Sequence, residues 1–90
     1  MLPIVWRAEA QADFAAIITY IADRNPAAAS RLAAAIGDTI ERCASFPYIY
    51  RPGRIEGTRE AVVTPNYIVV YSVTDMIDVV AVLHARQQYP

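Results

Sequence analysis

The sequence predicts an α+β fold of the order β-α-α-β-β-β, in which a helical hairpin packs on one face of a mostly antiparallel four-stranded sheet. Two observations support this prediction. Apolar residues in the first half recur with the period of a helix, whereas the last third holds three apolar runs separated by breaks of hairpin length. The length of 90 residues suits a single domain spanning residues 1–90, with one modest core.

The apolar run at residues 4–6 indicates a first strand, and a helix is expected directly after it. Glu9 and Asp13 are acidic residues that suit the positive, N-terminal end of a helix dipole. Apolar side chains then recur at i, i+4, i+7, i+8 and i+11, which is the spacing of one helix face. These positions are Ala10, Phe14, Ile17, Ile18 and Ile21.

A second helix is expected to begin at Pro26, because Asn25 is a good N-cap and proline is tolerated at the first helical position. The short link makes the two helices antiparallel. Gly37 lies in the middle of this helix, where glycine costs about 1 kcal/mol relative to alanine. It either lets the first helix approach closely or is simply tolerated. The apolar stripe is Ala29, Leu32, Ala33, Ile36, Ile40 and Cys43 or Ala44.

Residues 45–58 hold two prolines and two glycines and predict a loop, and residues 59–63, 67–73 and 76–84 predict an antiparallel meander. Both faces of the last two strands are apolar, whereas a sheet with one wet face alternates apolar and polar residues. We therefore expect part of the sheet, or a groove beside it, to meet another chain. The side chains expected between helices and sheet are Phe14, Ile17, Ile21, Leu32, Ile36, Ile40, Val69, Tyr71, Val79 and Leu83.

The composition narrows the class of protein. Hydrophobic residues make up 56% and charged residues 19%, so the chain is more apolar than a typical soluble domain. All eight basic residues are arginines, which suits anionic ligands or reflects a GC-rich genome, and the net charge of −1 argues against a general nucleic-acid coat. The single cysteine, Cys43, excludes an internal disulfide and a cysteine-rich metal site. We expect a cytoplasmic protein with no cofactor and no membrane partner.

Candidate functional side chains follow the last strand, where His84, Arg86 and Tyr89 are expected to emerge together at the rim of the sheet. Histidine can transfer protons near neutral pH, and arginine can stabilise charge that develops on a phosphate. The alternative is a histidine whose hydrogen bonds are satisfied by its neighbours.

Further arginines lie earlier in the chain. Arg51 and Arg54 are in the loop, which also carries tyrosines and can stack on or bind a phosphate, or simply cover the core. Arg59 begins the next strand, so together with His84 it could belong to a metal-free ribonuclease site. In a meander, however, the start of that strand and the end of the last one lie at opposite ends of the sheet.

Several motifs, taken in order, resemble the RelE/ParE superfamily of type II toxin–antitoxin toxins, and the resemblance covers essentially the whole chain. It implies a growth-inhibiting toxin of this fold, neutralised by a cognate antitoxin encoded beside it. We expect an antitoxin of the ribbon-helix-helix type, with a disordered C-terminal segment that folds on the toxin. The motifs are Ala10-x-x-Asp13-Phe14-x-x-Ile17-x-x-Tyr20-Ile21, Phe46-Pro47, Gly57-Thr58-Arg59-Glu60, and the segments at residues 65–71 and 82–90.

Two mechanisms are known in that superfamily: RelE-like toxins cut messenger RNA on the ribosome, and ParE-like toxins poison DNA gyrase. RelE-like nucleases carry a transition-state arginine early in the strand that corresponds to residues 67–73, and the matching position here is Ile68. Their basic residues on the preceding strand reduce to Arg59, with Ala61 where a second would stand. Each such contact can be worth several kcal/mol, so the resemblance favours a non-catalytic gyrase poison. The alternatives are a ribosome-dependent endonuclease, with Arg59, His84 and Arg86 as catalytic candidates, and a divergent or inactive member.

Overall fold

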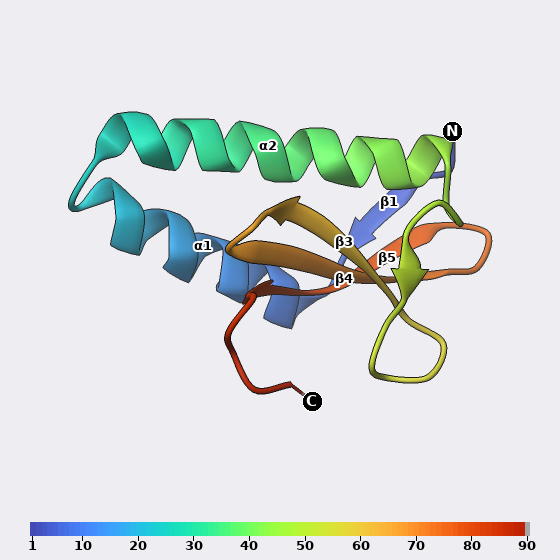
Figure 1. Cartoon of the computed structure of the whole chain (residues 1–90). Helices are drawn as coiled ribbons and strands as arrows, with labels where there is room; N and C mark the ends of the chain where they lie inside the picture. The colour runs from blue at the N-terminus through green and yellow to red at the C-terminus, as the bar shows by residue number, and fades with distance from the viewer. Residues whose placement is uncertain (90) are drawn as a thin grey trace.

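The computed structural model describes residues 1–89, so residue 90, the last of the predicted domain and of the 82–90 motif, lies outside the described part. Two helices pack on one face of a mixed five-stranded sheet with the strand order β1-β5-β4-β3-β2 (Figure 1). The predicted α+β fold is confirmed. The elements are β1 (Ile4–Trp6), α1 (Ala8–Ala22), α2 (Pro26–Ser45), β2 (Arg51–Pro52), β3 (Arg59–Thr64), β4 (Tyr67–Val73) and β5 (Ile77–His84).

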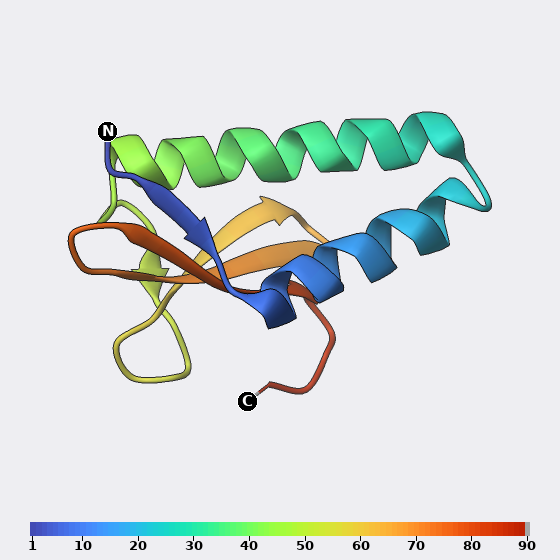
Figure 2. The same ribbon diagram turned by 180° about the vertical axis from the view of Figure 1, so that it is seen from behind.

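The helical hairpin turns where the sequence predicts. The side chain of Asn25 accepts a hydrogen bond from the main-chain N–H of Ala28 at 3.1 Å and caps α2, with Pro26 as the first helical residue. From this turn the two helices diverge, so that α2 runs along the top of the molecule and α1 descends toward β1 (Figure 2). A Cβ built on Gly37 meets nothing within 4 Å, so this glycine does not serve a close approach of α1. No helix among residues 1–89 is long and apolar enough to cross a membrane.

The sheet has one strand more than the four expected. Arg51 pairs with Glu60 and Pro52 with Arg59, which makes β2 a two-residue edge strand inside the predicted loop. So short a strand has no periodicity to detect, and proline is tolerated at a sheet edge because no neighbour needs its missing N–H.

The register of the meander decides which candidate residues can meet. Arg59 lies opposite Tyr71, and His84 lies opposite Tyr67. These two positions on β4 are about 13 Å apart at about 3.3 Å per residue. The predicted separation of Arg59 and His84 is therefore confirmed.

The main core lies between the helices and the sheet. Ile36, Ile40, Val69, Tyr71 and Val79 are buried there, as expected. The α1 side chains expected beside them are only partly buried and pack against the edge of the core, because α1 diverges from α2. They are Phe14, Ile17 and Ile21.

A second apolar cluster, formed by Ile68, Val70 and Leu83, lies on the opposite face of the sheet. The expectation that Leu83 faces the helices is wrong. Pairing between β4 and β5 shifts from Val70–Ala81 to Tyr71–Val79, and this irregularity puts one extra residue into β5. Since side chains alternate along a strand, the extra residue moves Leu83 to the other face from Val79.

The second cluster is covered without a partner chain. Tyr89, Val80 and Ala81 pack against it, so its three members are buried although the helices lie on the other side. This cluster therefore needs no other chain to cover it, and the expectation that part of the sheet, or a groove beside it, meets another chain stays a prediction for the rest of the surface. The exposed large apolar residues include Val5 on the edge strand β1, Val62 on β3, and Phe46, Tyr48 and Ile49 in the loop after α2.

Candidate functional site

A buried carboxylate organises the open face of the sheet, which is the face that the helices leave uncovered. Glu60 on β3 is only 2% exposed. Its Oε1 accepts a hydrogen bond from Arg51 Nη2 at 3.2 Å, and its Oε2 accepts one from the main-chain N–H of Arg54 at 3.1 Å. Arg54 Nε lies 3.4 Å from the same Oε2. Burial of a carboxylate is costly unless cations and donors surround it, so Glu60 fixes the loop between β2 and β3.

The segment after β5, at residues 85–89, returns over this face and meets the same loop. Arg54 Nη1 donates to the main-chain oxygen of Tyr89 at 3.2 Å, and the Arg54 guanidinium carbon lies 5.1 Å from the centre of the Tyr89 ring. The Tyr89 ring packs against the second apolar cluster. Its hydroxyl oxygen is buried and has no hydrogen-bond partner among residues 1–89. Tyr89 therefore has a packing role that the sequence did not reveal.

The rim itself is built around His84. Its ring stacks edge to face on Tyr67 with centroids 5.2 Å apart, and its Nδ1 accepts a hydrogen bond from the main-chain N–H of Arg86 at 3.1 Å. An accepting Nδ1 carries no proton, so the other ring nitrogen bears it in this arrangement. The main-chain N–H of Ala85 donates to Asn66 at 2.7 Å and fixes the turn, which leaves the Arg86 side chain exposed.

Arg59 belongs to a different part of the molecule. Its Nη1 donates to the main-chain oxygens of Tyr50 at 2.7 Å and Tyr48 at 3.4 Å, and its guanidinium carbon lies 4.9 Å from the centre of the Tyr48 ring. These contacts hold the loop after α2. A hollow of about 280 Å³ lies beside it, lined by Tyr48, Pro52, Gly57, Thr58, Arg59 and Val73.

Two buried titratable groups lie under this loop. The Tyr71 hydroxyl donates to the main-chain oxygen of Pro47 at 2.7 Å. Burial is the main cause that raises the pKa of Tyr71, and burial likewise raises the pKa of the Cys43 thiol. Both groups are therefore neutral near pH 7, and neither is an activated nucleophile or a general base.

The structure thus divides the predicted site residues into three places. On the open face, Arg51 and Arg54 contact Glu60, and Tyr89 contacts Arg54. His84 and Arg86 form the rim. Arg59 begins β3, opposite Tyr71 and away from the rim. No group of three or more histidine, cysteine or acidic side chains that could hold a metal exists within residues 1–89. Sequence reasoning missed Glu60, although two arginines shortly before a carboxylate in an apolar strand were a usable signal.

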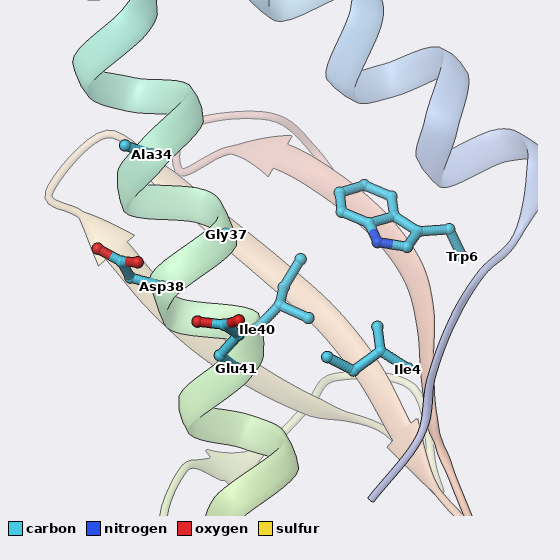
Figure 3. A pocket seen from close by; sticks show the side chains of 7 residues that line it. All are labelled: Ile4, Trp6, Ala34, Gly37, Asp38, Ile40 and Glu41. Atoms are coloured by element: carbon cyan, nitrogen blue, oxygen red, sulfur yellow. The ribbon is translucent and has the colours of Figure 1, made fainter.

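A groove on the helix side lies between β1 and α2 (Figure 3). Its volume is about 370 Å³, and Ile4 and Trp6 from β1 face Ile40 from α2 across it. A neighbouring hollow of about 650 Å³ continues along β1 toward Phe14. The groove is lined by Ile4, Trp6, Ala34, Gly37, Asp38, Ile40 and Glu41, so an apolar floor is combined with two carboxylates of α2.

Nearly the whole chain is similar to known toxins. The family described as "ParE toxin of type II toxin-antitoxin system, parDE" matches residues 4–89. The chain is 38% identical to the putative toxin Y4kP of Sinorhizobium fredii over 88 residues, which cover 97% of this chain and 92% of that protein. It is 35% identical to the toxin RelE2 of Caulobacter vibrioides over 90 residues, which cover 97% of this chain and 99% of that protein.

The fold is also shared with solved structures. A chain of the chromosomal ParDE toxin–antitoxin system from P. aeruginosa superposes with a TM-score of 0.77 at 19% identity, covering 93% of this chain and 96% of that one. A conserved hypothetical protein from Helicobacter pylori superposes with a TM-score of 0.65 at 16% identity, covering 99% of this chain and all of that one.

Proposed function

This chain belongs to the ParE toxin family of type II toxin–antitoxin systems, and we propose that it stops growth by poisoning DNA gyrase. The observation that supports gyrase over RNA as the target is the environment of Ile68. This residue stands where the resemblance places the transition-state arginine of the RNA-cutting toxins. It is 3% exposed and packs with Val70 and Leu83 in the second apolar cluster. An isoleucine there cannot donate a hydrogen bond to a reacting phosphate, a contact typically worth several kcal/mol.

The remaining basic groups also do not converge on one point. Arg59 donates to two main-chain oxygens of the loop after α2, whereas His84 lies about 13 Å away along β4 at about 3.3 Å per residue. General acid–base catalysis needs its groups within hydrogen-bond reach of one reacting centre. This separation favours a surface that binds a protein over one that cleaves RNA.

We propose that the rim provides the contact with gyrase, in the cytoplasm. Arg86 is exposed next to His84, and arginine and tyrosine often dominate the binding energy of protein interfaces. Tyr89, Arg51 and Arg54 lie on the adjoining open face and are further candidates. Arg59 is a candidate at the other end of the sheet.

The family implies a cognate antitoxin. We propose that it is of the ribbon-helix-helix type and that its disordered C-terminal segment folds along β1. Pro3 and Arg7 flank β1, and both hydrogen-bond to β5: the Pro3 oxygen accepts from the main-chain N–H of Ile77, and the Arg7 N–H donates to the Val79 oxygen. Because alternate residues of a strand direct their main-chain groups to opposite sides, those of Ile4 face away from the sheet. An extended segment can pair with such an edge. Asp38 and Glu41 beside the groove favour basic residues in that segment.

A ribosome-dependent messenger RNA endonuclease is the second candidate function. The relative named RelE2 and the hollow beside Arg59, where Tyr48 could stack on a base, favour it. In that case His84 and Arg86 would join Arg59 as catalytic residues.

Brief expression of the toxin and its variants distinguishes the two functions. We expect the parent to inhibit gyrase supercoiling and to induce DNA damage signalling, without sharp cuts in ribosome-bound messages. Arg86→Ala should abolish growth arrest, whereas His84→Gln, which keeps hydrogen bonding but cannot titrate, should retain most of it. Arg31→Ala, an exposed arginine on α2, is a matched control for loss of one positive charge. If His84→Gln is as inactive as Arg86→Ala and the parent cuts messages within codons, the endonuclease takes the place of the gyrase poison.

A further inference from the structure

Arg54 connects three parts of the chain that are distant in sequence. Its main-chain N–H and its Nε meet the buried Glu60 carboxylate, its Nη1 meets the main-chain oxygen of Tyr89, and its guanidinium lies over the Tyr89 ring. Figure 1 shows the 85–89 segment and the loop between β2 and β3 on the same side of the sheet, away from α2. Arg54 is therefore the link between this loop and the segment that continues from the rim.

Glu60 restricts where Arg54 can go. A carboxylate that is 2% exposed must keep its cationic partners, because leaving it unpaired in the interior is strongly unfavourable. Arg54 is itself 44% exposed at the side chain, so it reaches from the buried carboxylate to the surface. This geometry fixes one end of Arg54 and leaves its Nη1 to hold the 85–89 segment.

The docking of Tyr89 is incomplete. Its ring packs on the second apolar cluster, yet its hydroxyl oxygen is buried without a partner among the described residues. A buried hydroxyl that has lost water and gained no hydrogen bond opposes docking. The docked state of the segment thus depends on additional contacts. Among the described residues, the polar contacts between residues 88–89 and the rest of the chain are the two that Arg54 makes with Tyr89.

The turn nearer to His84 is held differently. Ala85 donates to Asn66, and Gln87 donates to the main-chain oxygen of His84 at 2.9 Å, both independently of Arg54. Loss of Arg54 should consequently free residues 88–89 and leave the turn at 84–87 formed. This difference separates release of the segment from general unfolding.

We propose that Arg54 is a positioning residue, which holds residues 88–89 on the open face through Glu60 and thereby sets where Tyr89 lies relative to the rim when the toxin meets its target. The docking part of this proposal is independent of the function proposed above. The effect on the target rests on the rim being the target-binding surface.

The experiment uses isotope-labelled full-length toxin, purified with its antitoxin and then separated from it. In the parent, nuclear Overhauser contacts are expected between the Tyr89 ring and the Leu83 methyl groups. Arg54→Gln should lower the docked population about two- to fivefold, the range set by one partly exposed charged contact. Arg51→Gln removes the other cation next to Glu60 without touching Tyr89, and it should leave these contacts at the parent level.

Tyr89→Phe provides a rescue that a merely structural role of Arg54 would not give. Removing a buried hydroxyl that has no partner among residues 1–89 should tighten docking, so Arg54→Gln combined with Tyr89→Phe should recover the ring contacts, and growth arrest to the level of Tyr89→Phe alone. If Arg54→Gln does not fold, Arg54→Lys, which keeps a positive charge beside Glu60 but has no second nitrogen to reach the Tyr89 main-chain oxygen, should still lower the docked population.

The outcomes are distinct. Unchanged ring contacts in Arg54→Gln would overturn the docking role. If Arg54→Gln loses the ring contacts but still arrests growth fully, the positioning role is overturned. It is also overturned if the double variant docks but does not arrest growth, because Arg54 would then touch the target directly. If docking and arrest are lost together while the parent cuts messenger RNA instead of inhibiting gyrase, the positioning role stands and the gyrase proposal fails.

Discussion

Substitution of Tyr71 by phenylalanine should show how the loop after α2 is fastened to the core. Tyr71 is 0% exposed, and its hydroxyl donates to the main-chain oxygen of Pro47 at 2.7 Å. Phenylalanine keeps the ring and therefore leaves no large cavity, but the Pro47 oxygen loses this donor. We expect Tyr71→Phe to lower the free energy of unfolding by about 1 to 3 kcal/mol at pH 7.5.

The difference in the free energy of unfolding between the parent and Tyr71→Phe should shrink at high pH. Burial raises the pKa of Tyr71 in the folded state above its usual value, so the folded chain keeps a proton that the unfolded chain loses. The unfolded state then binds fewer protons, and the free energy of unfolding falls as pH rises above about 10. For an unfolded pKa of about 10, this loss is about 0.8 kcal/mol at pH 10.5. Phenylalanine does not titrate, so the variant escapes this loss.

Urea unfolding followed by far-ultraviolet circular dichroism at pH 7.5 and pH 10.5 measures both effects. Burial also raises the pKa of Cys43, so both proteins should carry Cys43→Ala to remove the thiol titration. The free-energy difference between them should decrease by about 0.8 kcal/mol between the two pH values. A difference near zero at pH 7.5, or one that does not change with pH, would mean that the Tyr71 hydroxyl is not buried and bonded to Pro47.

Three further outcomes are expected. Ile36→Ala, at a fully buried position of the main core, should lower the free energy of unfolding by about 2 to 5 kcal/mol. Leu83→Ala, in the small second cluster, should fall at the lower end of that range. An unchanged melting temperature for either variant would contradict the burial of that side chain. Gly37→Ala should stabilise the free toxin by up to about 1 kcal/mol and weaken antitoxin binding by calorimetry, because its Cβ would enter the groove. Purified toxin without antitoxin should self-associate and bind an apolar dye through Val5 and residues 46–49, and a monomer that binds no dye at high concentration would contradict this expectation.

The helices and the meander could be predicted because their signals are local. A repeated apolar face identifies each helix, the Asn25 and Pro26 pair marks where α2 begins, and short polar breaks separate the strands. The separation of Arg59 from His84 followed from meander geometry alone. Each helix, turn and strand of this prediction depends on residues that are close in sequence, and the separation follows once the strands are in order.

The features that were missed depend on pairing between distant residues. A two-residue strand such as β2 exists only because β3 lies beside it. The extra residue in β5 is likewise a property of its register with β4, and nothing in the run from Ile77 to His84 shows where the alternation changes. A rule of strict alternation therefore placed Val79 correctly and Leu83 on the wrong face.

The candidate site likewise has a part that local signals predict and a part that depends on distant contacts. His84 and Arg86 could be placed at the rim because they follow the last periodic strand, but the periodicity ends there, and residues 85–89 have no repeated face that would predict their path. Tyr89 is held by Arg54, which lies 35 residues earlier. The clue was Glu60, since a carboxylate inside an apolar strand must find cations. Its neighbour Arg59 points to the other face of the sheet, and the next arginines before it in the chain are Arg54 and Arg51, which do contact it. Pairing this one charge with the two loop arginines would have predicted that Arg51 and Arg54 lie on the open face. Because Arg54 also holds Tyr89, that pairing would have indicated where the last segment docks.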